Sequence, residues 1–420
     1  MNIPFKEGNI LIPKNIDMTK WSVVACDQYT SEPDYWQEVK DIVKDTPSTL
    51  NLTLPEIYLE EKDVDEKIHK INDTMDDLLA KDFFYEYKDA MIYLERTQND
   101  GLVREGLIGL IDLEAYSYEI GDESLIRGTE KTVIERVPPR VKIRKNASLE
   151  LPHIMVLIDD DKKEIIESLK NEATKKDIIY DFNLMKNGGH VKGYLLNKNT
   201  IKNVKTKLET LADPKNFQKK YNIKNKNVLL FAMGDGNHSL TAAKVCYENL
   251  KKSMKEEEYL NHPSRYALVE LVNLHSDALT FESINRVVFN TNPKDLLNKL
   301  KKYYNLNKDG IGQEITIITK NSDETWYISN PKSNIAVGSI QIFLDEYLEN
   351  NPGKIDYIHG TKATKDLVSK SENNIGFIFN PIKKEELFKT VILDGTLPRK
   401  TFAMGHSYDK RYYLEARKIN

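Results

Sequence analysis

The sequence predicts a mixed α/β (α+β) fold, in which strands and helices alternate without the strict period of a doubly wound protein. Short apolar runs of strand length recur along the 420 residues, and amphipathic stretches with helical spacing separate many of them. Hydrophobic residues make up 40% and charged residues 30% of the chain, which is the balance of a globular protein. No repeat of about 20–50 residues is visible, which argues against a solenoid or a propeller.

The first half of the chain mixes helices with strand pairs. The apolar run 21–26 (WSVVAC) predicts a buried strand, and Pro33 stands where a first helical turn begins. Asn99-Asp100-Gly101 is a turn between two apolar runs, so 90–96 and 102–113 predict a hairpin. The other expected elements are helices over 34–44, 64–81, 162–174 and 198–212, a strand over 153–158, and a strand pair over 177–183 and 190–196.

The second half begins with the segment that carries most information. Residues 227–233 (NVLLFAM) are an apolar run of strand length, 234–238 (GDGNH) are a turn, and 239–251 predict a helix. Beyond them we expect strands over 265–274 and 375–379, a hairpin over 313–329, and helices over 294–304, 338–349, 361–371 and 383–389.

The predicted domain organisation has three regions with soft boundaries. These are an amino-terminal α+β region over 1–213, a core strand–GDGNH–helix region over 214–292, and a carboxy-terminal α/β region over 293–420. The Lys/Asn-rich stretch near 214–227 and the segment near 290–312 are the candidate boundaries. One merged domain is the alternative.

Composition excludes several classes of protein. Lys and Arg number 61 against 65 Asp and Glu, so the net charge is −4, which argues against a broad nucleic-acid surface. No apolar run of about 18 residues and no signal-peptide pattern occurs, and two cysteines are too few for a disulfide framework. We therefore expect a cytoplasmic protein that binds small molecules and no membrane. The oligomeric state stays open.

The strand–GDGNH–helix unit is the first candidate site. A turn bounded by Gly234 and Gly236 lets the backbone approach a ligand, and the following helix start offers unpaired N–H groups that suit phosphate. Asp235 can hold a magnesium ion or take a proton, and His238 can donate to phosphate or act as a base. Asn237 and Ser239 can bind an anion, although both are also ordinary helix caps. The usual P-loop, zincin and nucleophile-elbow motifs do not occur.

Two further segments carry charges that could bind an anion. In 127–145, one or more of Arg136, Arg140 and Arg144 could hold a phosphate, with Glu135 (or the nearby Glu130) as a general base. In 393–406, a basic loop that contains Lys400 could close over a negatively charged ligand. Ordinary solvated loops are the alternative interpretation of both segments.

These residues resemble the bacterial and archaeal family named for domain of unknown function 1015, over nearly the whole chain. Its diagnostic strand, Asp-Gly-His-His-Arg box and helix correspond to 235–239 here, where the box is Asp-Gly-Asn-His-Ser. The polar turn 25–31, the segment 284–286 that ends in Arg286, and the loop 397–401 (LPRKT) resemble other parts of that family. This chain departs from the box at Asn237 and Ser239, so the usual arginine is missing.

The Asp-Gly-x-His core also resembles the ParB/sulfiredoxin-like superfamily, which includes partition proteins that use CTP, sulfiredoxin that uses ATP, and kinases for free serine. The resemblance implies a ParB/sulfiredoxin-like core elaborated by additional strands and helices. It also implies a nucleoside triphosphate held at the start of a helix.

The resulting expectation is a nucleotide-dependent phosphotransferase, a small-molecule kinase that uses ATP and Mg²⁺, with a serine-like acceptor implied by the resemblance alone. Phosphoryl transfer needs mainly positioning and charge neutralisation. Two alternatives are a nucleotide-binding regulatory protein without turnover and a phosphate-ester hydrolase on the same scaffold. The expected catalytic residues are Asp235 (also the metal ligand), His238 and Glu135, and the expected phosphate-binding residues are Gly234, Gly236, Asn237, Ser239, Arg136, Arg140, Arg144, Arg286 and Lys400.

Overall fold

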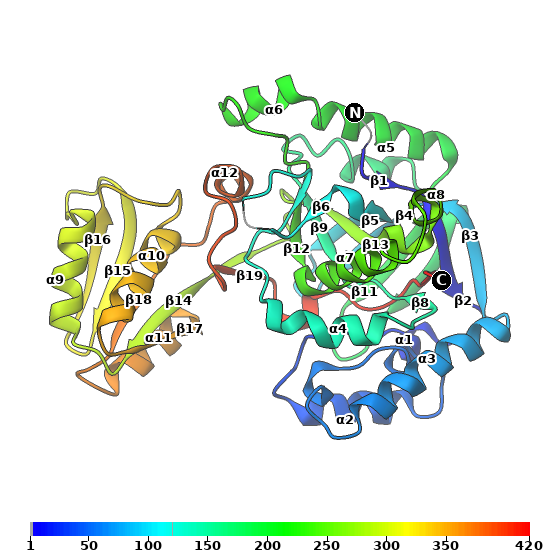
Figure 1. Cartoon of the computed structure of the whole chain (residues 1–420), viewed down its shortest axis with the longest axis horizontal. Helices are drawn as coiled ribbons and strands as arrows, with labels where there is room; N and C mark the ends of the chain where they lie inside the picture. Colours follow the sequence, from blue (N-terminus) through cyan, green and yellow to red (C-terminus); the bar gives the residue numbers. More distant parts are fainter. Residues whose placement is uncertain (1–2, 120) are drawn as a thin grey trace. The chain divides into compact units, whose positions relative to one another are not determined.

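A computed structural model describes residues 3–119 and 121–420 and confirms the mixed α/β class (Figure 1). Contacts within the chain divide it into two compact units. Unit 1 comprises 1–128, 132–279 and 406–420, and unit 2 comprises 129–131 and 280–405. This division does not follow the three regions expected from the sequence, since residue 213 lies inside unit 1.

Unit 1 is built on a large mixed sheet in the order β10-β11-β4-β5-β13-β9-β12-β7-β6, with β1 paired to β5. Most neighbours are antiparallel, but β13 runs parallel to β9, and β7 runs parallel to both β12 and β6. The strands are β1 (Phe5–Lys6), β4 (Ile92–Thr97), β5 (Val103–Asp112), β6 (Tyr116–Ser117), β7 (Ile126–Arg127), β9 (Met155–Ile158), β10 (Ile178–Asn183), β11 (His190–Leu195), β12 (Phe231–Asp235) and β13 (Tyr266–Asn273).

Two small ribbons and eight helices in the described part of unit 1 accompany this sheet. The ribbons pair β2 (Gly8–Pro13) with β3 (Phe84–Ala90) and β8 (Leu149–Glu150) with β20 (Arg417–Lys418). The helices are α1 (Met18–Trp21), α2 (Pro33–Val43), α3 (Val64–Ala80), α4 (Val137–Arg144), α5 (Lys198–Leu211), α6 (Pro214–Tyr221), α7 (Asn237–Lys251) and α8 (Glu256–Asn261). Polar caps set some of these ends: the Asn197 side chain accepts the N–H groups of Asn199 and Thr200 at the start of α5.

Two expectations for unit 1 are wrong. The run 21–26 is buried but forms no strand, since its ladder contact is a single bridge from Val24 to Tyr412. The stretch 162–174 is no α-helix and contains only a short 3-10 helix over Glu167–Asn171. Its apolar residues Ile165, Ile166 and Leu169 are all buried, so the spacing that suggests a helix is satisfied by an irregular segment.

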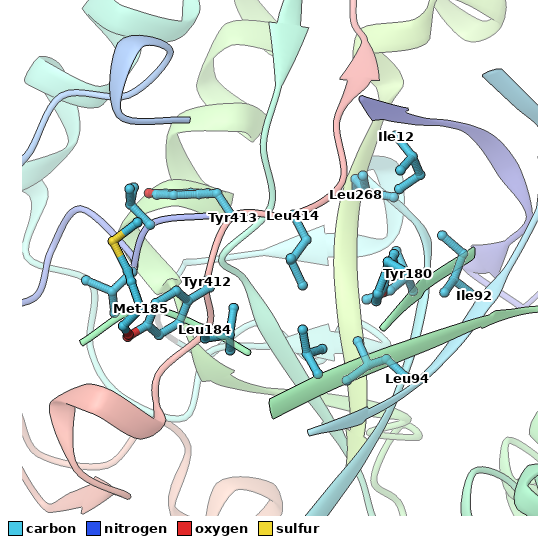
Figure 2. Close-up of a cluster of buried hydrophobic side chains, with 14 of the residues drawn as sticks. Ile12, Ile92, Leu94, Tyr180, Leu184, Met185, Leu268, Tyr412, Tyr413 and Leu414 are labelled. Atoms are coloured by element: carbon cyan, nitrogen blue, oxygen red, sulfur yellow. The ribbon is translucent and has the colours of Figure 1, made fainter. Parts of the chain in front are cut away.

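Two hydrophobic clusters form part of the core of unit 1. The first joins the sheet to α2 and to Tyr412–Leu414 near the carboxy terminus, which enter the core beside Leu268 (Figure 2). The second joins α3 to the β8–β20 ribbon and includes Leu54, Met75 and Leu149. Leu151 packs against both clusters, so it marks the boundary between them.

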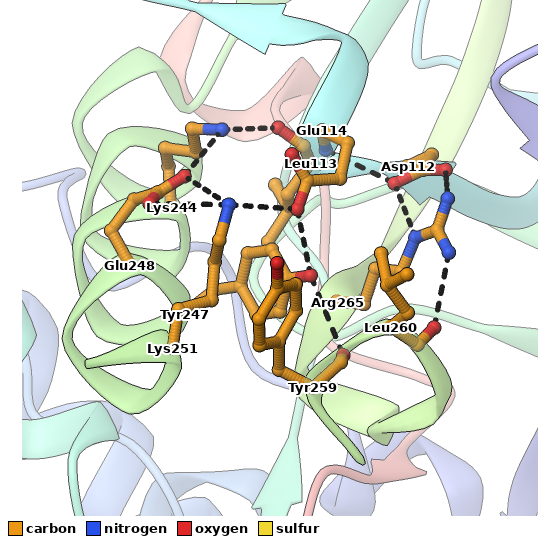
Figure 3. Close-up of polar contacts among 10 residues, drawn as sticks. All are labelled: Asp112, Leu113, Glu114, Lys244, Tyr247, Glu248, Lys251, Tyr259, Leu260 and Arg265. Atoms are coloured by element: carbon orange, nitrogen blue, oxygen red, sulfur yellow. Dashed lines mark hydrogen bonds and ion pairs between the residues drawn. The ribbon is translucent and has the colours of Figure 1, made fainter. Parts of the chain in front are cut away.

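Helix α7 follows directly from β12, and its carboxy-terminal half is fixed by polar contacts (Figure 3). The Tyr247 hydroxyl donates to Glu114 at 2.8 Å, and Lys251 pairs with the same carboxylate at 2.9 Å. Lys244 donates to the Leu113 carbonyl at 2.8 Å and pairs with Glu248. These bonds fix the helix whose amino terminus forms the predicted site.

Unit 2 contains a second sheet, in the order β16-β15-β18-β14-β17, with β19 paired to β14. The expected hairpin over 313–329 is present as β15 and β16. The strands are β14 (Phe281–Phe289), β15 (Gln313–Thr319), β16 (Ser322–Ile328), β17 (Lys354–His359), β18 (Ile375–Ile378) and β19 (Phe402–Met404), and the helices are α9 (Pro293–Tyr304), α10 (Ala336–Asn350), α11 (Thr361–Ser369) and α12 (Lys384–Asp394). Across 3–119 and 121–420, no helix is both long and apolar enough to cross a membrane.

Candidate functional site

The turn from β12 into α7 has a backbone that only glycine adopts easily. Gly236 has φ +78°, and a Cβ added there would lie 3.0 Å from the Cα of Ile154. Its N–H donates to the Asp235 carboxylate at 2.8 Å, which closes the turn. Helix α7 then begins at Asn237, two residues earlier than the sequence indicates. The N–H groups of Asn237 and His238 have no acceptor within the helix, so they can bind an external anion.

His238 is held in a neutral state at this helix start. Burial, followed by the charges of Arg140 and Arg136, lowers its pKa to about 4. Its Nε2 accepts the Val133 N–H at 3.3 Å, so the ring proton is assigned to Nδ1. A neutral imidazole with one N–H is a hydrogen-bond donor to an oxyanion at pH 7.

Arg136 and Arg140 supply positive charge next to the helix start, from α4 and the turn before it. Helix α4 packs against α7. Both guanidinium groups reach Glu56: Arg140 forms a close ion pair with it, and Arg136 lies 4.0 Å away. Arg140 also donates to the Arg136 carbonyl at 2.6 Å. The position of Arg140 is therefore fixed before any ligand binds, whereas the Arg136 side chain is mostly exposed.

Ser239 belongs to a buried chain of hydrogen bonds. The Cys26 N–H donates to the Tyr413 hydroxyl at 3.1 Å, and this hydroxyl lies 3.2 Å from His153 Nδ1. His153 Nε2 lies 3.0 Å from Ser239 Oγ. Burial keeps Tyr413 protonated and lowers the pKa of His153.

The proton positions along this series of hydrogen bonds follow from the donor at its first member, the Cys26 N–H. Because the Tyr413 oxygen accepts from Cys26, its own proton goes to His153 Nδ1. The neutral ring then carries its proton on Nε2 and donates to Ser239 Oγ. The Ser239 proton is left free to donate to a ligand at the helix start.

Two carboxylates and a lysine complete the site. Lys410 Nζ lies 3.1 Å from Asp235 Oδ2. Burial opposes the ionisation of Asp27, but His153, the Gln28 amide and Lys410 together hold its pKa below the usual range. The charges of Asp27 and Asp235 both act on the same buried His153.

A cavity of about 120 Å³ opens beside these groups. Arg140, His153 and Ser239 form part of its wall, so it adjoins the polar site. Most of its other lining residues are apolar.

The remaining residues predicted from the sequence differ from these in exposure or in bonding partners. Glu135 is exposed, and Arg144 is bound to Glu150, whose carboxylate also pairs with Arg417. Gly234 lies inside β12, one residue before Asp235. The Asn237 amide oxygen is buried and has no hydrogen-bond partner among the described residues.

Arg286 and Lys400 belong to unit 2. Arg286 is fully buried, donates to Gln341 at 3.0 Å, and binds the carbonyl groups of Ile284, Arg399 and Lys400. Arg286 therefore anchors the basic loop through the backbone carbonyl groups of Arg399 and Lys400. The Lys400 side chain is exposed, and the loop amides of Lys400 and Thr401 donate to Glu130.

Several residues of the site were not among those predicted from the sequence. Asp27 and Cys26 lie in a polar turn near the amino terminus, and Lys410 and Tyr413 come from the carboxy-terminal segment. His153 follows a proline at a strand start, a position typical of structural histidines. Of these residues, only those in the polar turn 25–31 could have been found from the sequence, because this turn resembles part of the family pattern.

The donor set can be compared with what a magnesium ion needs. No cluster of three or more His, Cys, Asp or Glu side chains suited to a metal occurs in the described part of the chain. Mg²⁺ bound with a nucleotide typically takes one or two carboxylates, with phosphate and water as its other ligands. The carboxylates nearest this role are Asp235, which is paired with Lys410, and Asp27, and the charges of both act on His153.

Comparison with known proteins identifies a family. Residues 9–347 match the family described as "Protein of unknown function (DUF1015)". No curated protein matches this sequence.

Solved structures are similar only at a distance. SbnI with a C-terminal truncation from Staphylococcus aureus has a TM-score of 0.36 and 10% identity, covering 71% of this chain and 82% of that one. A conserved hypothetical protein from Pyrococcus furiosus has a TM-score of 0.36 and 10% identity, covering 74% and 94%. Free serine kinase in complex with AMP has a TM-score of 0.37 and 11% identity, covering 74% and 91%. Likeness at these scores carries no argument about function.

Proposed function

The chain belongs to the DUF1015 family, and from the geometry of its site we propose that it is a nucleotide-dependent phosphotransferase that acts on a small hydroxyl compound. The observation that carries this proposal is the set of donors at the start of α7. Free helix amides, a neutral His238, the Ser239 hydroxyl and two arginines converge there. Phosphate is the ligand chemistry that matches such a set.

The arginines and the helix amides would bind the phosphates of the donor nucleotide. Arg140 and Arg136 balance the charge on the phosphoryl oxygens, while His238 and Ser239 donate hydrogen bonds to them. Glu56 keeps the Arg140 guanidinium group in place. Most of the rate enhancement would come from charged and polar groups that are already in place before the substrate binds.

In the proposed reaction, the acceptor hydroxyl oxygen attacks the terminal phosphorus and the bond to the bridging oxygen breaks. The nucleoside diphosphate leaves, and the acceptor proton passes to a carboxylate. Asp235 or Asp27 would take this proton, and the pKa of Asp27 is held below its usual range. Glu135 stays a candidate base on the exposed side of the site.

We take ATP as the donor, from the resemblance of 235–239 to the ParB/sulfiredoxin-like box, which also implies a serine-like acceptor. Whichever of Asp235 and Asp27 does not take the proton would hold Mg²⁺ together with phosphate oxygens. The ion would supply further neutralisation of phosphate charge.

The test combines titration calorimetry with a turnover assay. ATP, ADP, CTP, GTP and pyrophosphate are titrated with Mg²⁺ into the wild type, Arg140→Gln and Arg265→Gln. Arg265 is a matched control, because its guanidinium is bound to Asp112 near the other end of α7. Transfer from ATP to serine and other alcohols is then followed by phosphorus NMR.

We expect a triphosphate to bind the wild type and Arg265→Gln, to bind Arg140→Gln more weakly, and to donate phosphate to an alcohol. Binding without transfer to any acceptor would make the protein a nucleotide-dependent regulator. Hydrolysis of phosphate esters without a triphosphate would make it a hydrolase. No binding of any nucleotide to a folded sample would overturn the proposal.

A further inference from the structure

The cavity beside the site has a wall of polar and apolar side chains. Arg140, His153 and Ser239 are polar members of the wall that belong to the site, and Cys26, Thr53 and Tyr413 also line it. The apolar part of the wall, called here the apolar body, includes Leu54, Met75, Leu149, Leu151, Leu268 and Ala242.

The position of this cavity follows from the two clusters of the core. Leu54, Met75 and Leu149 belong to one cluster, Leu268 belongs to the other, and Leu151 touches both. The space lies where the two clusters meet without closing against each other. Unfilled apolar volume forfeits dispersion contacts, so protein interiors contain few such spaces.

Helix α7 contributes one polar and one apolar residue to the cavity wall, Ser239 and Ala242. Ser239 and Ala242 are three residues apart, so both side chains point from the same face of the helix. A ligand lying along this face would place its hydroxyl or phosphate near Ser239 and its carbon atoms next to Ala242.

We infer that the cavity binds the apolar body of the acceptor, so that the substrate is an alcohol with a hydrocarbon or aromatic group about as large as benzene, in place of the serine-like compound that the resemblance implies. This inference rests on the proposed phosphotransferase function. An apolar protein cavity of about 150 Å³ is known to bind benzene, and the volume here is about 120 Å³. A nucleobase fits the lining poorly, because the apolar side chains offer no partners for its polar edge.

The ion pair in the cavity wall does not contradict an apolar occupant. Glu150 is buried, but its carboxylate is bound by Arg144 and Arg417 and also accepts the Leu268 N–H at 2.9 Å. Its hydrogen-bonding capacity is therefore used within the protein. Arg140 and Ser239 remain the groups directed at the polar part of a ligand.

The experiment measures binding of benzyl alcohol and glycerol by ligand-observed NMR, alongside binding of ATP by calorimetry. The proteins are the wild type, Ala242→Leu and Ala147→Leu, since both alanines line the cavity and a leucine at either position fills part of it. The second variant keeps the test valid if the first fails to fold. Glycerol is the control ligand, with a hydroxyl but no apolar body.

We expect benzyl alcohol to bind the wild type at least tenfold more tightly than glycerol, and a folded filled variant to lose at least tenfold of this affinity. ATP affinity should stay within twofold in the same variant. Equal binding of the two alcohols, or undiminished binding of benzyl alcohol after filling, would overturn the inference. A parallel loss of ATP would also overturn it, because the cavity would then hold the nucleotide.

The two proposals fail separately. Wild type that binds ATP but not benzyl alcohol contradicts the cavity assignment alone. Wild type that binds benzyl alcohol but no nucleotide contradicts the phosphotransferase function, and with it the role of the cavity as an acceptor site.

Discussion

The two ends of helix α7 are held in different ways. At the carboxy-terminal half, Tyr247 and Lys251 both bind Glu114, and Arg265 binds Asp112 with two hydrogen bonds (Figure 3). At the amino-terminal end, the first helix amides have no acceptor in the helix, and the Asn237 amide oxygen has no partner among the described residues.

This difference separates a structural end from a functional end. The polar groups drawn at the carboxy-terminal half serve one another, so they stabilise the helix and leave little capacity for a ligand. The groups at the amino-terminal end are positioned by Glu56, Val133 and His153 but still have donors to offer. Substitutions at the two ends should therefore change different measured quantities.

The largest effect on ligand binding is expected for Arg140→Gln. A hydrogen bond to a charged group contributes about 1.5–3 kcal/mol, so the dissociation constant for ATP should rise roughly 10- to 150-fold. Titration calorimetry measures this change. Affinity within twofold of the wild type would remove Arg140 from the site.

The next effect concerns the turn that begins the helix. In Gly236→Ala, a residue with a side chain must adopt the left-handed conformation and approach Ile154, so stability should fall by about 1–2 kcal/mol. Urea unfolding checks this value. An unchanged midpoint would mean that the turn relaxes without strain.

A smaller effect on stability, with no effect on ligands, is expected for Glu114→Gln. Tyr247 keeps a hydrogen-bond acceptor, while Lys251 loses its ion pair with this side chain, so the loss should be about 1 kcal/mol or less. Thermal unfolding and calorimetry with ATP are measured on the same sample. Weaker ATP binding would contradict the separation of the two ends.

A further effect is a pH dependence of stability that arises from His238. Its pKa is lowered from about 6.5 to about 4 in the folded protein, so the unfolded chain binds the proton more readily. Stability should therefore fall as the pH drops from 6.5 to 4. His238→Gln should lose less stability over this range. Parallel curves for the two proteins would contradict a neutral, buried His238.

The sequence predicts elements well where local pattern and tertiary packing agree. The hairpin of β4 and β5 surrounds the expected Asn99-Asp100-Gly101 turn, and α3 covers nearly the expected residues. The run 21–26 misleads because this buried apolar segment pairs with the carboxy-terminal segment through a single bridge, Val24 to Tyr412, and not through a strand ladder. Residues 162–174 mislead because their apolar spacing also suits an irregular segment.

The site is only partly visible in the sequence. Local spacing gives 235–239, since a strand, a glycine turn and a helix start are consecutive. The contribution of Asp27, His153 and Lys410 depends on which distant segments meet, and no local pattern encodes that. Arg144 shows the converse. Like Arg140 it is paired with a glutamate, but Arg140 acts on His238 at the helix start, whereas the charges that lower the pKa of His238 do not include Arg144.

The most direct test of the central claim is hydrogen–deuterium exchange with and without ATP and Mg²⁺. If phosphate binds at the start of α7, peptides covering 235–240 should exchange more slowly when the nucleotide is present, while peptides covering 247–251 should change little. Protection that appears elsewhere and spares 235–240 would contradict a phosphate site at this helix start.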